Sequence, residues 1–205
     1  MKIIGLSGSS GSGKGYASSV FEELGIPAID TDRLYREKTV KRGTACLEEL
    51  TSEFGAEILD GAGELNRAFL ARMVFENDKT GEKLKRLNEI THKYIKLDTA
   101  MLIEKYRQEG APAVIIDAPV LYESNFDKMC DFCVCMIAPM DSKIERIIKR
   151  DGISREKALA RLSTQMSDSE LIKRSKYKID NSGVDIKAQI IEILEKENII
   201  HIKEQ

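Results

Sequence analysis

The strongest indication of the fold is the segment Gly8-Ser9-Ser10-Gly11-Ser12-Gly13-Lys14-Gly15, which has the composition of a loop that binds phosphate through its main chain. Glycine permits positive φ angles and leaves the backbone N–H groups unobstructed by Cβ atoms. An apolar strand over residues 2–6 precedes the loop, and residues 16–24 follow with a helical pattern whose N-terminal dipole favours a bound anion. Strand, loop and helix thus occur in the order of a nucleotide site. The residues expected to contact ATP here are Gly8, Gly11, Ser12, Gly13, Lys14, Gly15 and Tyr16.

Gly15 departs from the usual pattern of such loops, in which a Ser or Thr after the lysine ligates Mg²⁺ through its hydroxyl. Adenylate- and cytidylate-type kinases carry the same Gly-Lys-Gly variant and hold their metal largely through water. The departure therefore does not exclude ATP, but it argues against direct metal ligation from the loop. The alternative is a strand-to-helix turn that binds nothing, which unchanged ATP binding and turnover in a Lys14→Ala variant would support.

The composition is that of one soluble globular domain with inserted segments, since 42% of the 205 residues are hydrophobic and 32% are charged. A net charge of −2 gives no reason to expect nucleic acid or an anionic membrane as partner. Because no apolar run reaches the length of a membrane span or resembles a signal peptide, we expect a cytoplasmic protein. Of the four cysteines, Cys133 and Cys135 lie in an apolar stretch, which favours buried strand thiols over a zinc site.

Five short segments rich in β-branched residues alternate with helical stretches, and this alternation predicts an α/β fold with a five-stranded parallel sheet flanked by helices. A closing helix over 185–197 precedes a candidate edge strand at Ile199–Ile202. The five predicted strands are residues 2–7, 26–30, 113–117, 131–137 and 177–181.

Two helical segments interrupt the alternation. The first contains an apolar stripe at helical spacing, which is more typical of core packing than of a binding groove; its members are Leu84, Leu87, Ile90, Tyr94, Leu97 and Met101. The second has ten Lys or Arg residues against six Asp or Glu, and is either a basic lid over the nucleotide or a solvated face. The predicted organisation is a single domain, 1–205, with a core of 1–31, 112–140 and 177–205, a helical insertion at 32–111 and a lid at 141–176.

Carboxylates follow two predicted strands at their carboxyl ends, where open parallel sheets bind ligands. We expect Asp32 to align and deprotonate a hydroxyl that attacks the γ-phosphate beside Mg²⁺. The alternative for Asp30 or Asp32 is to cap the helix that begins near Arg33. Asp117 is expected to hold a metal-bound water, with a strand-end cap as its alternative.

Arg146 and Arg150 lie four residues apart in the lid and so share a helix face. Their guanidinium groups suit the charge that spreads over a transferring phosphoryl group. We expect them to close over ATP together and exclude water, which would otherwise hydrolyse it. With Lys14 and Asp32 they complete the predicted catalytic set.

Several separated blocks resemble the dephospho-CoA kinase family over nearly the whole chain. Beyond the loop, the matching blocks are Ile29 to Asp32, Glu64 to Phe75, Leu87 to His92, Asp117 to Glu123, Arg150 to Gly152 with Ala158, Arg161 and Gln165, and Ile179 to Gly183. The departures are Gly15, Thr31 and Lys93, and of these only Gly15 touches the chemistry. Gly15 bears on how magnesium is held and leaves the implied reaction unchanged.

This resemblance implies a P-loop kinase fold with ATP and Mg²⁺ as cofactors. The implied reaction is phosphorylation of the ribose 3′-hydroxyl of dephospho-CoA to give coenzyme A and ADP, the last step of coenzyme A synthesis. By the same resemblance the insertion binds the acceptor, with Arg67 and His92 as candidate contacts, and Asn181 and Gly183 border the adenine. His92 fits equally well as a packed helix histidine. A monomer is the favoured state.

Two other functions fit parts of the sequence. A nucleoside or nucleoside-monophosphate kinase is favoured by Gly-Lys-Gly and disfavoured by the Asp-Thr-Asp and Asp-Asn-Ser-Gly blocks. A GTP-binding switch is the non-enzymatic alternative, and it is disfavoured because the chain lacks an Asn-Lys-Xaa-Asp element after a strand.

Overall fold

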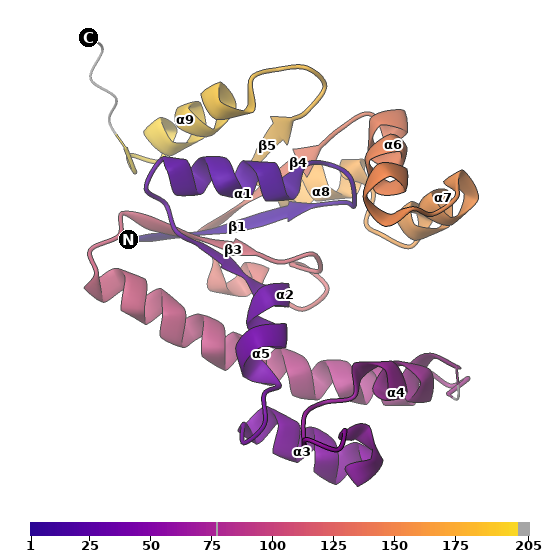
Figure 1. Cartoon of the computed structure of the whole chain (residues 1–205). Coiled ribbons are helices and arrows are strands. Elements are labelled where there is room, and N and C mark those ends of the chain that lie inside the picture. The colour runs from indigo at the N-terminus through magenta and orange to yellow at the C-terminus, as the bar shows by residue number, and fades with distance from the viewer. Residues whose placement is uncertain (77, 201–205) are drawn as a thin grey trace. The chain divides into compact units, whose positions relative to one another are not determined.

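A computed structural model describes residues 1–76 and 78–200, which form two compact units (Figure 1). The first unit combines Met1–Ile29 with the chain from Ile103 onward, and the second is Asp30–Leu102. A five-stranded sheet with the order β2-β3-β1-β4-β5 is built on parallel ladders, so the predicted fold class is confirmed. Its strands are β1 (Lys2–Gly8), β2 (Ala28–Asp30), β3 (Ala113–Asp117), β4 (Phe132–Ile137) and β5 (Tyr177–Asp180).

The strand β2 begins two residues later than the predicted segment 26–30. The Ile26 N–H donates to the Phe21 carbonyl at 2.9 Å, and Pro27 has no N–H to offer a neighbouring strand. The Pro27 carbonyl accepts from Ile115 N at 2.8 Å and so meets β3 one residue ahead of Ala28. The other four strands match their predictions to within one residue at each end. The candidate edge strand does not form at Ile199 and Ile200, and its last two residues lie outside the described chain.

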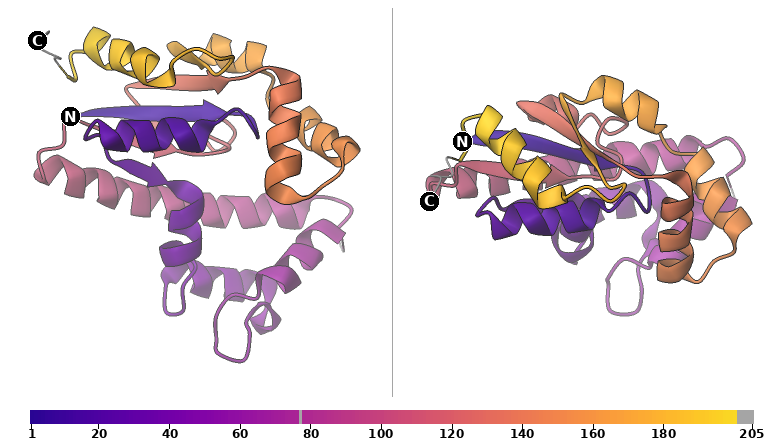
Figure 2. Two further views of the ribbon diagram at one scale, coloured as in Figure 1. Left: turned by 45° about the horizontal axis from the view of Figure 1, so that its top comes forward. Right: turned by 90° about the horizontal axis from the view of Figure 1, so that it is seen from above.

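Helices pack against the sheet in the first unit (Figures 1 and 2). The helices α1 (Lys14–Glu23) and α9 (Ile186–Lys196) lie side by side and share one core with the strands. Ile4, Leu6 and Phe21 in that core are completely buried, and each contributes about 1.5–3 kcal/mol to folding. Along β4, Cys133 and Cys135 alternate with the core residues Phe132, Val134 and Met136 and are also buried, which confirms the expectation of buried strand thiols.

Three helices follow β4 and occupy most of the predicted lid segment. They are α6 (Met140–Asp151), α7 (Arg155–Ser163) and α8 (Asp168–Arg174). Many of their basic groups are paired within the segment: Arg155 with Asp141 at 2.6 Å, Arg174 with Glu170 at 2.8 Å. Carboxylates of the same segment thus neutralise many of its basic groups, which leaves fewer of these groups to bind a ligand.

The second unit is helical and has its own core. Its elements are α2 (Thr31–Leu34), the π-helical turn η1 (Tyr35–Thr39), α3 (Ala45–Phe54), the short turn η2 (Ala56–Ile58), α4 (Arg67–Ala71), the π-helical turn η3 (Arg72–Glu76) and α5 (Glu82–Gln108), which runs on into the first unit. Leu84, Leu87, Ile90 and Tyr94 pack in this core, as predicted for the stripe. For Leu97 and Met101 the prediction of core packing is wrong, because the 27-residue helix continues past this core and leaves them 54% and 56% exposed.

Candidate functional site

The loop between β1 and α1 requires glycine at two positions. Gly11 has φ 76° and Gly13, the N-cap of α1, has φ 101°, a region that other residues enter only with strain. A Cβ atom at Gly11 would lie 2.4 Å from the Lys143 carbonyl oxygen, and one at Gly13 would lie 2.4 Å from the Asn181 side-chain nitrogen. Later segments of the chain thus pack directly on the loop, and the predicted strand, loop and helix are confirmed.

Two predicted site residues hold the loop by its carbonyl groups. Arg146 Nη1 donates to Gly11 O at 3.0 Å and to Ser12 O at 3.3 Å, and Asn181 Nδ2 donates to Ser12 O at 2.8 Å. In a planar trans peptide the N–H points away from the C=O. Donors on Ser12 O therefore turn the Gly13 N–H to the opposite side, as a loop that receives phosphate requires.

Lys14 and Asp117 form an ion pair at the start of α1, with side chains 18% and 9% exposed. The parallel register pairs Leu6 with Asp117 and so carries this carboxylate to within two residues of the end of β1, next to the loop. Asp117 thus lies beside the loop as predicted and pairs with the Lys14 ammonium group, while its role in holding a metal-bound water stays a prediction.

The residues around the loop fit magnesium held mainly through water and phosphate. Mg²⁺ typically binds one or two carboxylates and keeps several waters. Asp117 supplies one hard oxygen donor, while nothing lies within 4 Å of the position of a Cβ atom at Gly15. Among the described residues, His, Cys, Asp and Glu nowhere gather in a group of three or more that would form an all-protein cage.

Arg150 has a different environment from Arg146, although both lie on α6. Its guanidinium group makes two hydrogen bonds to the neighbouring Asp151, at 2.7 and 2.9 Å, and Arg161 also pairs with that carboxylate. These two cations, Arg150 first, hold the pKa of Asp151 well below its usual range. The joint action of Arg146 and Arg150 stays a prediction: Arg146 hydrogen-bonds the loop, whereas Arg150 hydrogen-bonds Asp151.

In the second unit, the two aspartates at the junction of β2 and α2 lie in different environments. Asp30 Oδ1 accepts from Arg33 N at 2.9 Å and is the N-cap of α2. Asp32 lies in the first turn of that helix with an exposed side chain. The structure therefore assigns the capping role to Asp30, and the catalytic role of Asp32 stays a prediction.

The candidate acceptor contacts also lie in the second unit. Arg67 donates from Nη2 to Arg36 O at 3.1 Å, and its guanidinium carbon lies 5.3 Å from the centroid of the Tyr35 ring. His92 is half-buried on α5, and burial, followed by the nearby charge of Lys96, lowers its pKa. The lowered pKa favours the neutral imidazole of His92 at pH 7.

The remaining predicted nucleotide contacts lie at the ends of the loop and after β5. Tyr16 is 58% exposed in the first turn of α1, and Gly8 is the last residue of β1. Gly183 is exposed, with φ 100°, three residues beyond β5.

Two polar residues near the loop received no role from the sequence. Lys143 is buried (3% exposed) and pairs with Asp168 at 2.6 Å, which ties α6 to the start of α8. Gln165 hydrogen-bonds Ser10 of the loop. The resemblance block that contains Gln165 is the one sequence signal for it, whereas Lys143 has none beyond its place in a basic helix.

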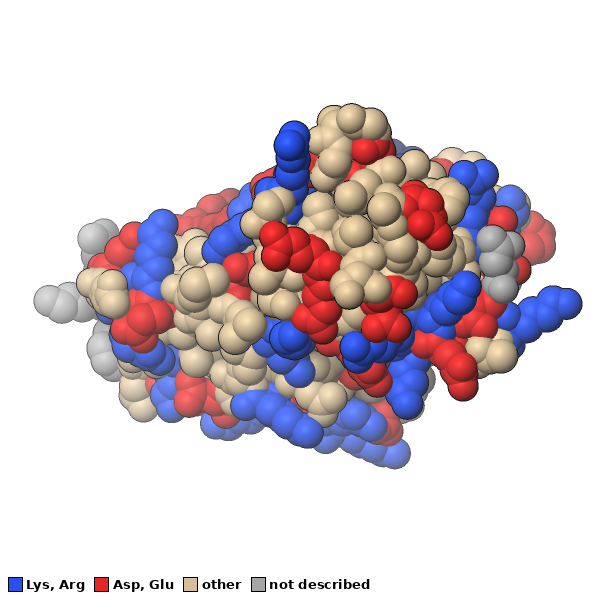
Figure 3. Space-filling view, turned by 90° about the horizontal axis from the view of Figure 1, so that it is seen from below, with Lys and Arg blue, Asp and Glu red and all other residues tan. Residues whose placement is uncertain are grey.

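Acidic and basic side chains are interspersed on the face shown in Figure 3. Among the described residues, no helix combines the length and apolar character needed to cross a bilayer.

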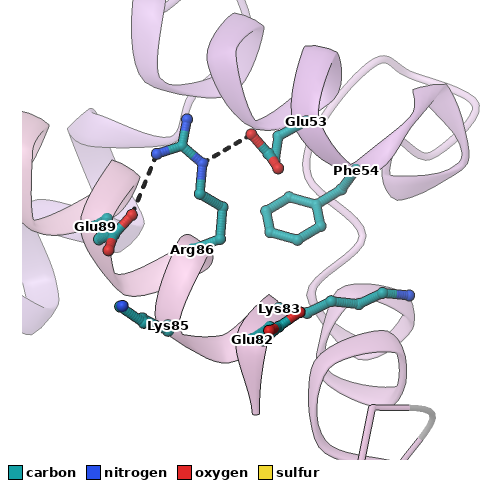
Figure 4. Close-up of a pocket in the computed structure, with 7 residues that line it drawn as sticks. All are labelled: Glu53, Phe54, Glu82, Lys83, Lys85, Arg86 and Glu89. Atoms are coloured by element: carbon teal, nitrogen blue, oxygen red, sulfur yellow. Dashed lines mark hydrogen bonds and ion pairs between the residues drawn. The ribbon is translucent and has the colours of Figure 1, made fainter. Parts of the chain in front are cut away.

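Two hollows lie within the second unit. One, of about 430 Å³, lies between α3 and the start of α5, where Arg86 bridges Glu53 at 2.8 Å and Glu89 at 3.2 Å (Figure 4). The other, of about 390 Å³, is lined by residues that include Leu47, Leu59 and Arg42. Neither is lined by Arg67 or His92.

Comparisons with known proteins agree on one family. The family model described as dephospho-CoA kinase matches residues 2–186. A dephospho-CoA kinase of Bacillus cereus is 38% identical over 200 residues, which cover 97% of this chain and 98% of that protein. A dephospho-CoA kinase of Listeria monocytogenes serotype 4b is 36% identical over 181 residues, 88% of each.

Solved structures show the same fold. A Thermus thermophilus protein has a TM-score of 0.79 and 30% identity, covering 96% of this chain and 97% of its own. Dephospho-CoA kinase from Campylobacter jejuni has a TM-score of 0.68 and 24% identity over 95% of this chain and 96% of its own.

Proposed function

The chain belongs to the dephospho-CoA kinase family, and from that premise we propose that it transfers the γ-phosphoryl group of ATP to the ribose 3′-hydroxyl of dephospho-CoA. The products are coenzyme A and ADP, so the enzyme is an ATP-dependent kinase of coenzyme A biosynthesis. The observation that carries the proposal is the glycine loop at the start of α1, with Lys14 and Asp117 paired beside it.

We assign the triphosphate to this loop. The orientation of the Gly13 N–H, the dipole of α1 and the ammonium group of Lys14 all favour anionic oxygens at the same place. Lys14 would move from Asp117 to the β- and γ-phosphates, exchanging one anionic partner for another. Arg146 stabilises the loop from its carbonyl side, and Arg150 is assigned to the developing charge on the γ-phosphate.

We assign the proton of the acceptor hydroxyl to Asp32. As the 3′-oxygen attacks the γ-phosphorus, its proton passes to the Asp32 carboxylate, and the bond from phosphorus to the β-bridging oxygen breaks. Asp117 would hold Mg²⁺ through a water molecule, and Asp32 is its second candidate carboxylate. When bound, the metal neutralises charge on the β- and γ-phosphate oxygens.

Arg67 and His92 are assigned to the acceptor. Arg67 is held by Arg36 O and the Tyr35 ring, so its orientation is fixed before any ligand arrives. A neutral His92 can donate or accept a hydrogen bond to the acceptor. Asn181, Gly183 and Tyr16 are assigned to the adenosine of ATP. We also propose a cytoplasmic monomer.

A coupled ADP-release assay with dephospho-CoA, adenosine and CMP as competing acceptors tests the reaction. Turnover with dephospho-CoA alone supports the proposal, and preference for adenosine or CMP supports a nucleoside or nucleoside-monophosphate kinase instead. Preference for GTP over ATP, without an acceptor, would point to a GTP-binding switch.

The role of Asp32 is tested by a matched pair of variants. Asp32→Asn should lower kcat by about 10²- to 10⁴-fold while ATP binding is retained, because a proton acceptor is lost. Asp30→Asn is the control, since asparagine caps a helix about as well as aspartate. Equal loss in both variants would remove Asp32 from its assigned role.

A further inference from the structure

Gln165 makes two hydrogen bonds to one residue of the phosphate loop. Its Oε1 accepts from the Ser10 main-chain N–H at 2.9 Å, and its Nε2 donates to Ser10 Oγ at 3.0 Å. Gln165 lies in the connection between α7 and α8, and its own N–H donates to Leu162 O at 3.2 Å at the end of α7. The lid segment is therefore joined to the loop by a side chain that is fixed at both ends.

The main-chain bond fixes a peptide plane that matters for the shape of the loop. The N–H of Ser10 belongs to the same planar unit as the carbonyl of Ser9. That carbonyl accepts from Ser12 N at 3.1 Å and closes the turn at the tip of the loop. Gln165 thus binds the N–H group of the peptide unit whose carbonyl group closes the turn.

The next peptide planes are held in the same way by other side chains. Arg146 bonds the carbonyls of Gly11 and Ser12, and Asn181 bonds the carbonyl of Ser12. Those contacts orient the planes nearer to Lys14, but they do not reach the Ser9–Ser10 plane. Gln165 hydrogen-bonds that plane through the Ser10 N–H.

We propose that Gln165 is a positioning residue that orders the Ser9–Ser10 peptide and thereby sets the affinity of the loop for a polyphosphate. This inference rests on the proposed function, since it assumes that the loop binds the triphosphate of ATP. A preorganised loop loses less conformational freedom on binding, so its affinity is higher. The affinity for the acceptor should not depend on this contact.

Two variants separate hydrogen bonding from packing. Gln165→Met keeps the length of the side chain but loses both hydrogen bonds, whereas Gln165→Ala also loses its bulk. We expect both to bind ATP and inorganic tripolyphosphate about tenfold more weakly, with the KM for dephospho-CoA unchanged. Ser163→Ala is the control, because its hydroxyl bonds only the Ala160 carbonyl in its own helix turn among the described contacts.

Amide hydrogen exchange gives a readout that does not depend on activity. In Gln165→Met the amides of Ser10 and Ser12 should exchange about tenfold faster, because one bond is removed and the turn that it supports is loosened. The Ile115 amide, bonded to Pro27 O, should be unaffected.

Three results would overturn the inference: wild-type ATP affinity in Gln165→Met, unchanged exchange at Ser10 and Ser12, or tighter ATP binding in either variant, which would make Gln165 a competitor of phosphate. A wild-type protein that neither binds nor turns over ATP would instead overturn the proposed function, and the exchange experiment still reports on Gln165 in that case.

Discussion

Two glycines of one loop should respond in opposite directions to the same substitution. Gly13 has φ 101°, and a Cβ atom there would lie 2.4 Å from Asn181 Nδ2. Gly15 lies inside α1, and nothing lies within 4 Å of the position of its Cβ atom. Gly13→Ala should therefore destabilise the first unit, and Gly15→Ala should stabilise it slightly.

The magnitudes follow from the two environments. An alanine at positive φ costs about 1–3 kcal/mol. Displacing the Asn181 amide also breaks its 2.8 Å bond to Ser12 O, which contributes about 0.5–1.5 kcal/mol. Gly13→Ala should thus lower the free energy of unfolding by about 2–4 kcal/mol. Gly15→Ala should raise it by up to about 1 kcal/mol, because alanine loses less backbone entropy than glycine in a helix.

Thermal unfolding followed by circular dichroism measures both changes, with ATP affinity by calorimetry alongside. For a chain of this size 1 kcal/mol shifts Tm by about 2–4 °C, so Gly13→Ala should melt at least several degrees below wild type. It should also bind ATP poorly, whereas Gly15→Ala should retain binding. A Gly13→Ala protein with wild-type Tm and ATP affinity would show that position 13 needs neither a positive φ nor the space beside Asn181.

Three further predictions concern pH, capping and metal. In the unfolded chain His92 takes up a proton below about pH 6.5, before the half-buried folded side chain does. Stability should therefore fall as pH drops through this range, and His92→Gln should reduce the loss of urea midpoint between pH 7.5 and pH 5.5. Asp30→Ala should cost about 1 kcal/mol in urea unfolding because α2 loses its cap, whereas Asp30→Asn should match wild type. Gly15→Ser, which has open space for its hydroxyl, should lower the Mg²⁺ concentration for half-maximal turnover; an unchanged metal dependence would place the metal out of reach of this position.

The parts of the fold that the sequence predicted are those set by local pattern. Apolar runs bounded by turns marked the strands, and the loop between β1 and α1 followed from its glycines and one lysine. Asp117 was placed beside the loop because parallel strands end at the same edge of a sheet. None of these inferences needed knowledge of distant contacts.

The sequence did not predict which of two similar, neighbouring residues makes a given contact. Helix spacing put Arg146 and Arg150 on one face, but only tertiary packing decided that one guanidinium meets the loop while the other meets Asp151. Asp30 and Asp32 were both possible caps until the entry geometry of α2 selected Asp30. Periodicity likewise cannot show where a core ends, which is why Leu97 and Met101 were assigned to it wrongly.

The conformation of the phosphate loop depends both on its own sequence and on contacts from distant segments of the chain. Its glycines allow the backbone to turn its N–H groups inward, yet glycine also makes the unfolded loop the most flexible part of its neighbourhood. The carbonyl groups on the outer side are bonded by Arg146 and Asn181, and Gln165 holds the tip, all from segments more than a hundred residues away. An isolated peptide with the loop sequence would lack all three and should bind polyphosphate poorly. Affinity for the nucleotide is therefore a property of the folded first unit, and substitutions in the lid segment should change it as much as substitutions in the loop.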